Sequence, residues 1–265
     1  MIDDASTDAS AEKITQLQKN NPFLFLQNEQ NLGLQTSLNH ALTVVSGEYL
    51  GIFASDDAIL PKKIEKLVSF IQRHNLDGAY ASGYVLYPGG QQVPMDMERV
   101  DQMFKDGTYL EHIYVCDTYG AMFQSGLFKA SALKNLSYIR KQFWSDDWAV
   151  TIKLLENYHI GFLNEPTVIY RVHENNTYKN YWNSFPGRVQ VVSLLTPLEV
   201  RYRALSNLFR SQAAYLEPDN LPFATKFYFA SLAMEFSREN LAKCISVLNI
   251  RPQILKRILL RMLIK

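Results

Sequence analysis

The sequence predicts an α/β fold in which a mostly parallel central sheet carries helices on both faces and a helical C-terminal region follows. Short apolar runs alternate with segments whose apolar residues recur every three or four positions, which indicates strands joined by crossover helices. Acidic pairs follow the first apolar runs, at the sheet edge where ligands bind in open α/β folds. From about residue 189 onward the pattern is helical throughout.

The elements of the first half follow from this alternation. Helices are expected where Leu, Ile and Ala recur at helical spacing, with Gly47 where a helix stops and Pro61 where the next one starts. In order, we expect a helix over residues 10–20, a strand over 23–26, a helix over 34–45, a strand over 49–53, a helix from Pro61 and a strand over 79–87, ending in a hairpin turn at 88–90.

The second half is less regular. Residues 88–118 show little pattern and are expected to be loop-rich. Beyond them we expect a strand over 120–123, a helix over 147–156 and strands near 160–163 and 168–171. Asn, Gly and Pro cluster at 174–188, so the predicted domains are an α/β domain over 1–178 and a helical region over 179–265.

Composition places the chain among ordinary globular proteins. Apolar residues make up 47% and charged residues 20% of its 265 residues, and the formal net charge of +1 gives no general attraction to nucleic acid. Two distant cysteines, Cys116 and Cys244, indicate neither a disulfide framework nor a metal cluster and fit a reducing cytoplasm. No apolar run reaches the length of a membrane span. We therefore expect a cytoplasmic protein.

Three acidic pairs carry the functional interpretation: Asp3-Asp4, Asp56-Asp57 and Asp146-Asp147. Carboxylates crowded at a sheet edge repel one another and are best tolerated beside a cation such as Mg²⁺ or Mn²⁺, which usually also holds substrate phosphates. For Asp56-Asp57, a solvated helix cap before Pro61 is about equally compatible with the pattern. The third pair is flanked by tryptophans, which favours a raised carboxyl pKa and general-base chemistry, although a helix N-cap explains the same residues.

Six motifs occur in a distinctive order, and with them the chain resembles the family 2 glycosyltransferases, which have the GT-A fold and make bacterial polysaccharides. The stretch from Gly47 to Pro61 is especially similar to the spore-coat type of that family, which also has Ala at position 54, two residues before Asp56. The motifs are Asp3-Asp4-Ala-Ser-Thr-Asp8, Asn31-Leu-Gly33, Ala41 to Tyr49, Ser55-Asp-Asp57 with Pro61, Trp144 to Trp148 and Tyr170-Arg-Val-His173.

The resemblance implies an inverting, metal-dependent sugar transferase with Mn²⁺ or Mg²⁺ as cofactor, a UDP- or dTDP-sugar as donor and a cell-surface glycan or lipid-linked molecule as acceptor. It assigns donor-base recognition to Asp4, ribose contact to Asp56 and catalytic base to Asp147. By the same resemblance, Asp57 and His173 bind the metal and Arg171 approaches the donor diphosphate.

The family begins with a strand, a loop and a helix that have no counterpart before Asp3, and about 30 residues of a βαβ unit are expected to be missing. A parallel sheet without its first strand exposes an apolar edge. The alternative to an active transferase is therefore a truncated, non-catalytic remnant that binds a partner or a nucleotide sugar without turnover.

The last segment, residues 252–265, differs from the rest of the chain. Its apolar residues fall on one helical face, and five positive charges at 251–265 have no acid between them. A basic amphipathic helix of this kind can lie on an anionic bilayer, which predicts peripheral contact with the inner face of the cell membrane. A helix docked on its own domain or at a dimer contact is the alternative. Nucleic acid is not an expected partner, because the tail lacks interleaved aromatics.

Overall fold

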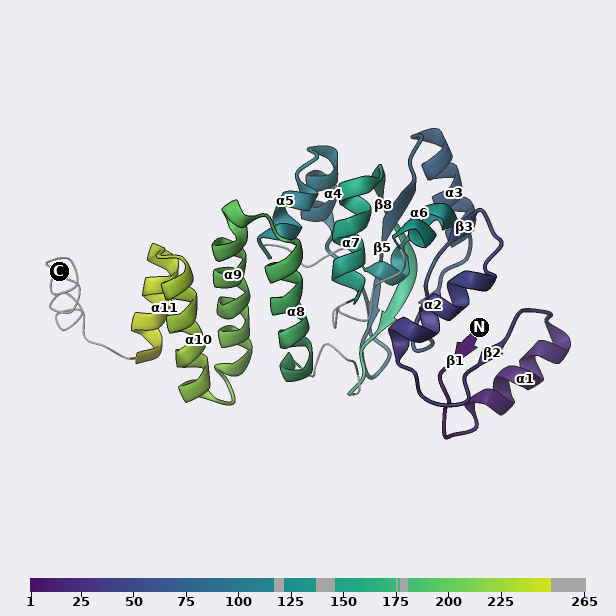
Figure 1. The fold of residues 1–265 in the computed structure, drawn as a ribbon, viewed down its shortest axis with the longest axis horizontal. Helices are drawn as coiled ribbons and strands as arrows, with labels where there is room; N and C mark the ends of the chain where they lie inside the picture. Colours follow the sequence, from purple (N-terminus) through teal and green to yellow (C-terminus); the bar gives the residue numbers. More distant parts are fainter. Residues whose placement is uncertain (117–121, 137–145, 175, 177–180, 249–265) are drawn as a thin grey trace, which may run out of the picture. The chain divides into compact units, whose positions relative to one another are not determined.

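The predicted α/β class is confirmed by a computed structural model, which describes residues 1–116, 122–136, 146–174, 176 and 181–248. The chain forms two units (Figure 1). The first comprises Met1–Leu110 with Gly120–Asn176, and the second comprises Glu111–Tyr119 with Thr177–Lys265. A short segment near residue 115 therefore groups with the C-terminal helices, which the sequence pattern does not indicate.

Strands and helices alternate through the first part of the chain, as the apolar periodicity predicts. The order is β1 (Ile2–Asp3), α1 (Ser10–Asn20), β2 (Leu26–Gln27), α2 (Leu34–Val44), β3 (Tyr49–Leu50), β4 (Ala58–Ile59), α3 (Lys63–Arg73), β5 (Gly78–Leu86), β6 (Gln92–Pro94), α4 (Glu98–Lys105), α5 (Tyr109–Tyr114), a 3₁₀ turn η1 (Phe123–Ser125), β7 (Leu127–Lys129), α6 (Ala130–Asn135), α7 (Asp146–Asn157) and β8 (Ile160–Arg171).

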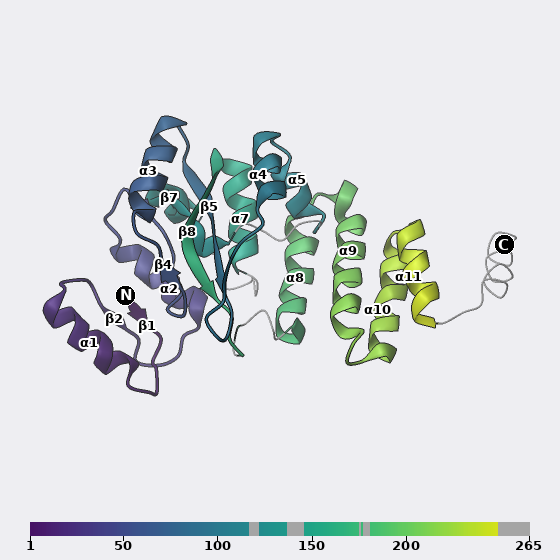
Figure 2. The same ribbon diagram turned by 180° about the vertical axis from the view of Figure 1, so that it is seen from behind.

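The central sheet is mixed, so the expectation of a mostly parallel sheet is wrong. Its strand order is β3-β7-β5-β8-β4, with β6 paired to β5. Only β5 and β8 run parallel in this sheet, while the other pairs are antiparallel. The antiparallel partners β3, β4, β6 and β7 are strands of two or three residues, and β6 joins β5 through a tight turn rather than a helical crossover. A separate parallel pair, β1 with β2, is connected by α1 (Figure 2).

Helices cover both faces of the central sheet, as predicted. Side chains alternate along β5, so its residues pack against helices on both sides of the sheet. Ala79 and Ala81 point to one face, where they pack with Leu67 and Ile71 of α3. Tyr80 points to the other face, where its hydroxyl lies 2.7 Å from the Thr151 hydroxyl of α7. The long strands β5 and β8 are thus held between α3 on one side and α7 on the other.

Several boundaries differ from the sequence prediction. Residues 88–118, expected to be loop-rich, contain α4 and α5, whose many charged residues hide their short apolar faces. The expected strand over 120–123 is not found at its described end, where Phe123 starts η1, and residues 120–121 lie outside the described residues. The two strands expected at 160–163 and 168–171 are one strand, β8, which runs through Pro166 with a register irregularity near β5 residue Ser82.

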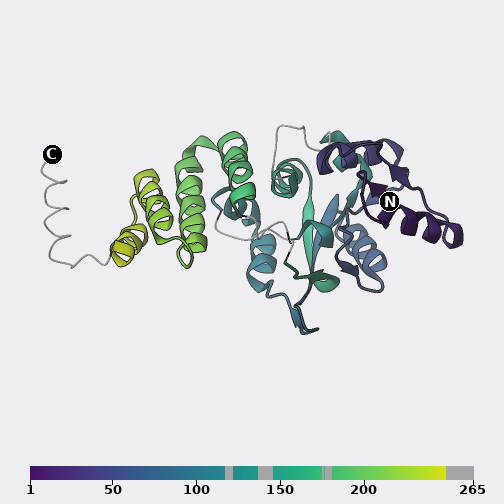
Figure 3. The same ribbon diagram turned by 90° about the horizontal axis from the view of Figure 1, so that it is seen from below.

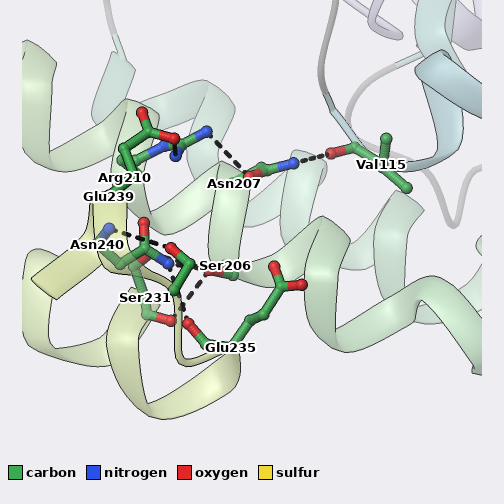
Figure 4. A network of polar contacts seen from close by, with 9 residues as sticks. Val115, Ser206, Asn207, Arg210, Ser231, Glu235, Glu239 and Asn240 are labelled. Atoms are coloured by element: carbon green, nitrogen blue, oxygen red, sulfur yellow. Dashed lines mark hydrogen bonds and ion pairs between the residues drawn. The ribbon is translucent and has the colours of Figure 1, made fainter.

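The second unit is helical, as predicted, with α8 (Tyr181–Leu195), α9 (Leu198–Leu216), α10 (Leu221–Met234) and α11 (Arg238–Leu248) in succession (Figure 3). A buried polar network joins three of these helices (Figure 4). The Ser206 hydroxyl of α9 lies 3.0 Å from that of Ser231 in α10, and Asn240 of α11 donates to Ser206 at 2.9 Å. Asn207 of α9 donates to the Val115 carbonyl at 2.8 Å, which ties the segment near residue 115 to this unit.

Within the part of the chain that the structure describes, no helix has the length and apolar character needed to cross a membrane. The basic segment 252–265 lies outside the described residues, so its predicted helix and membrane contact stay predictions.

Candidate active site

Four of the predicted site residues meet where β4 pairs with β8. The register aligns Ala58 with Ile169 and Ile59 with Val168, so the residues before β4 face those that end β8. The backbone N–H of Arg171 donates to Oδ1 of Asp57 at 3.0 Å. The Nε2 atom of His173 lies 2.9 Å from Oδ2 of Asp56. Two motifs more than 110 residues apart in sequence, around Asp56-Asp57 and Arg171-Val-His173, therefore form one cluster.

Asp57 is the buried member of this cluster, with 7% of its surface exposed. Burial raises the pKa of its carboxyl, and the charge of Asp56 adds to this effect, while the Arg171 N–H and the side chain of Gln124 oppose it. Its Oδ2 atom is buried and has no hydrogen-bond partner among the described residues. A buried carboxylate oxygen without a partner is rare in native proteins and calls for an explanation, such as an ion or a ligand that binds there.

A divalent ion fits this oxygen in part. Mg²⁺ and similar ions are commonly bound by one or two carboxylates, with waters and substrate phosphates completing the shell. Asp57 offers one such ligand. His173, predicted as a second ligand, is paired with Asp56 instead, and no group of three or more His, Cys, Asp or Glu residues in the described part of the chain is arranged to hold a metal. The residues present therefore fit an ion that is bound together with a phosphorylated ligand.

The Asp56–His173 pair is partly open to solvent, with side-chain exposures of 43% and 40%. Exposed ion pairs contribute only about 0–1 kcal/mol to stability, so this one is easily exchanged for contacts to a ligand. The pair is therefore available for binding rather than needed for folding.

Asp4 lies in a second cluster, at the carboxyl ends of β1 and β2. Its Oδ1 accepts from Asn28 Nδ2 at 2.8 Å and from the Leu32 N–H at 2.9 Å, and its Oδ2 accepts from the Gly33 N–H at 2.8 Å. Burial works to raise the pKa of this carboxyl, but the hydrogen bonds outweigh it and the pKa is lowered. Asp4 is thus held ionised and fixed in position.

These contacts explain the glycine of the Asn31-Leu-Gly33 motif. Gly33 has a φ of +82°, a conformation that other residues rarely adopt, and in this conformation its N–H reaches the Asp4 carboxylate. The other acid of the first pair, Asp3, is buried and accepts from both the backbone and the hydroxyl of Ser6. Asp3 therefore shapes the loop, and Asp4 is the acid left near the surface.

A shallow hollow of about 430 Å³ lies beside Asp4, at the ends of β1 and β2. This volume is within the range of small-molecule sites. Asn28 links the two features, since it lines the hollow and also bonds to Asp4. The lining residues are Ala5, Ser6, Gln27, Asn28 and Glu29.

Asp147, the predicted base, is exposed in the first turn of α7, where its Oδ1 accepts from the Trp148 N–H at 2.7 Å. The hydrogen bonds described above for Asp4 run to Asn28, Leu32 and Gly33, and the one described for Asp147 runs to Trp148. The structure thus brings together Asp56, Asp57, Arg171 and His173.

Sequence reasoning missed Lys63, two residues after Pro61. It is 3% exposed, its amine donates to the Gln124 carbonyl, and it lies 5.6 Å from the centre of the Phe53 ring. Burial lowers its pKa to about 8. Asn28 and Ser37 behind Asp4 were also missed. Only the amphipathic pattern of α3, with Lys63 on its apolar side, carried a signal for any of them.

A mixed sheet between helices, carrying paired carboxylates and a facing Arg-x-His segment, defines a candidate binding site for an activated phosphorylated substrate. Residues 1–131 match the model of Glycosyl transferase family 2, and this part of the chain is a domain of that family. This finding confirms the resemblance seen in the sequence.

Known proteins are similar to this chain in sequence or in fold. An uncharacterised glycosyltransferase of Methanocaldococcus jannaschii is 27% identical over 166 residues, covering 61% of this chain and 54% of its own length. S. aureus TarS 1-349 in complex with UDP-GlcNAc matches with a TM-score of 0.57 at 17% identity, over 93% of this chain and 69% of that one. The mannosyltransferase PcManGT of Pyrobaculum calidifontis, in complex with GDP-Man and Mn²⁺, matches with a TM-score of 0.55 at 16% identity, over 95% and 71%.

These likenesses confirm the GT-A fold. The chain spans about half the length of the Methanocaldococcus relative, so its activity, substrates and partners are taken up as proposals.

Proposed function

We propose that this protein is a metal-dependent, inverting glycosyltransferase that moves a sugar from a nucleotide-diphosphate donor to a hydroxyl of a cell-surface glycan or lipid-linked acceptor. The observation that carries the proposal is the buried Oδ2 atom of Asp57, which has no hydrogen-bond partner among the described residues. Asp57 lies within the part of the chain that matches glycosyl transferase family 2. TarS and PcManGT, which share the fold, have been captured with UDP-GlcNAc and with GDP-Man and Mn²⁺.

The Asp56–His173 cluster is assigned to the donor diphosphate. Mn²⁺ or Mg²⁺ bound at Asp57 would neutralise the charge that develops on the leaving diphosphate. Asp56 is assigned to the donor ribose. The backbone N–H of Arg171 donates to Asp57, so the cationic side chain of Arg171 begins close to the Asp57 carboxylate. His173 would exchange Asp56 for the ion or the diphosphate, a change that the weak exposed pair permits.

Asp147 is assigned as the base that takes the proton from the acceptor hydroxyl. Its exposure in the first turn of α7 leaves it accessible to an incoming acceptor. A carboxylate in this role typically contributes about 10²–10⁴ in rate. Attack by that hydroxyl on the face opposite the leaving diphosphate inverts the anomeric centre.

Peripheral membrane contact remains part of the proposal through residues 252–265. The support is the sequence alone: residues 251–265 carry five positive charges and no acid, and their apolar residues fall on one helical face. A lipid-linked acceptor would be met at the inner face of the cell membrane. Co-sedimentation with vesicles containing phosphatidylserine, compared with phosphatidylcholine vesicles, tests this point, and equal recovery in the two pellets would exclude the electrostatic contact.

The central test is calorimetric titration of the folded protein with UDP and with GDP, each with and without Mn²⁺. We expect heat of binding with at least one nucleotide, and we expect it to depend on Mn²⁺. Binding without any turnover of the matching nucleotide sugars would favour the non-catalytic remnant. No heat with either nucleotide, from protein with an intact circular dichroism spectrum, would refute the donor site itself.

A further inference from the structure

Lys63 carries a positive charge in a place where neither packing nor the helix favours one. It is 3% exposed and lies on the buried face of α3, in the first turn, where the helix dipole disfavours cations. Burial lowers its pKa to about 8, so the amine is still mostly protonated at pH 7. Within the described part of the chain no carboxylate pairs with this amine, which donates to the Gln124 carbonyl and lies near the Phe53 ring. Buried charges are normally paired, so stability alone does not explain this lysine.

The carbonyl that Lys63 contacts belongs to η1, which is held by a second contact as well. Ser125, the next residue, is fully buried. Its hydroxyl donates to the Met122 carbonyl at 2.7 Å and accepts from the Ala81 N–H of β5 at 3.1 Å. The backbone of Gln124 is therefore fixed by α3 through Lys63 and by β5 through Ser125.

From this fixed backbone the side chain of Gln124 reaches Asp57. Its amide donates toward the Asp57 carboxylate and lowers the pKa of that group, against the effect of burial. The same carboxylate accepts the Arg171 N–H at 3.0 Å through Oδ1. Donors from two separate segments thus restrain the carboxylate whose buried Oδ2 is the candidate ligand atom.

We propose that Lys63 is a positioning residue for this site: it fixes Gln124, and Gln124 holds the Asp57 carboxylate in the orientation that binds the ion and the donor diphosphate. The inference rests on the proposed function for what Asp57 binds. Without the amine, the backbone of Gln124 loses its contact to α3 and the carboxylate gains freedom to rotate. A group that must be ordered again on binding holds its ligand less tightly.

The test compares Lys63→Met, which keeps the length of the side chain, with Gln124→Leu and with the double variant. The first measurement is hydrogen exchange at the Arg171 amide, followed by NMR in EDTA without nucleotide. We expect this exchange to become about tenfold faster in each of the three proteins, which corresponds to one hydrogen bond to a charged group. The Asp77 N–H, which donates to the His159 carbonyl at the other end of β8, should keep its rate, whereas a general loss of stability would speed up both amides.

The second measurement is calorimetric titration with UDP in Mn²⁺, in which the affinity is expected to fall about tenfold in each variant. The double variant should show no more than the effect of either single one, because both residues act by one route. Lys66→Met is the matched control: Lys66 lies in the same helix, is more exposed and pairs with Glu165 at 2.8 Å, and its loss should change neither measurement.

The outcomes separate the inference from the function beneath it. Faster exchange at Arg171 in Gln124→Leu but not in folded Lys63→Met would overturn the role of Lys63, and additive effects in the double variant would overturn the shared route. If Lys63→Met does not fold, Lys63→Gln, which keeps a neutral donor of shorter reach, replaces it with the same expected result. Failure of the unaltered chain to bind UDP would refute the proposed function alone, because the exchange at Arg171 is measured without metal or nucleotide.

Discussion

Replacing Asp57 by Asn is expected to stabilise the metal-free protein at neutral pH, contrary to the usual effect of altering a buried residue. In the folded chain the ionised carboxylate is buried, and its Oδ2 has no partner among the described residues. An unsatisfied buried polar group costs about 1–3 kcal/mol. Asn keeps an acceptor for the Arg171 N–H but still buries a polar amide group there, so the expected gain is at the lower end, about 1 kcal/mol.

The effect depends on pH in a defined direction. Burial raises the pKa of Asp57 in the folded state from its ordinary value of 3.8, so the folded protein holds this proton more tightly than the unfolded chain. The contribution of Asp57 to stability therefore falls as the pH rises from 3.8 through the raised pKa, and is lowest above it. The stabilising effect of Asp57→Asn should be present at pH 7 and absent below pH 3.8.

The assay is thermal unfolding followed by circular dichroism, in EDTA and then in Mn²⁺ with UDP. For a unit of this size, 1 kcal/mol corresponds to about 2–4 °C in Tm. We expect Asp57→Asn to melt higher than the unaltered protein in EDTA and to lose the rise in Tm that Mn²⁺ with UDP produces by binding the native state. Asp106→Asn, which alters an exposed carboxylate, is the control. A lower Tm in EDTA together with an undiminished rise in Mn²⁺ would refute the reasoning.

Three further changes separate the remaining roles. Asp147→Asn should leave donor affinity unchanged and lower the transfer rate by about 10²–10⁴; normal transfer would remove Asp147 from the mechanism. His173→Ala should change the free energy of unfolding by less than about 1 kcal/mol yet weaken Mn²⁺-dependent UDP binding, and unaltered affinity would exclude His173 from the site. Gln212→Met should raise the unfolding free energy in urea by about 1–3 kcal/mol, because neither amide atom of this fully buried side chain has a partner among the described residues; destabilisation would show that the amide is satisfied.

The helices that were predicted well are those with a clear apolar stripe. The expected bounds of 10–20 match α1, and α2 and α3 lie within one or two residues of their predicted starts. In α3 the stripe of Leu67 and Ile71 is buried against Ala79 and Ala81, so the periodicity in the sequence and the packing have the same cause. By contrast, α4 buries only Val100 and Met103, and so short a stripe cannot be distinguished from a loop.

Strand direction was not predictable in the same way. The alternation of strands and helices correctly indicates the α/β class, but direction depends on which strands pair, and two-residue strands such as β3 and β4 carry no pattern of their own. Gly78 shows how such pairing is fixed: a side chain there would clash with the ring of Phe128 in β7. The contact is specified by shapes across the sheet, which a single sequence does not reveal.

The candidate site was also predictable only in part: the sequence indicated its residues, but not that they meet. Local chemistry identified Asp56 and Asp57, and the family resemblance added Arg171 and His173, yet their meeting depends on the antiparallel register of β4 with β8, in which Ala58 faces Ile169. A shift of that register by one residue would turn the Asp57 side chain to the opposite face and away from the Arg171 N–H. The two-residue strand β4, which no sequence pattern predicts, is therefore the element that assembles the site, and its short ladder is held in register partly by the Asp57–Arg171 hydrogen bond itself. Fold and site support each other here. A change such as Asp57→Asn, which removes the charge but keeps the hydrogen bond to Arg171, therefore tests the chemistry of the site without disrupting the pairing of β4 with β8.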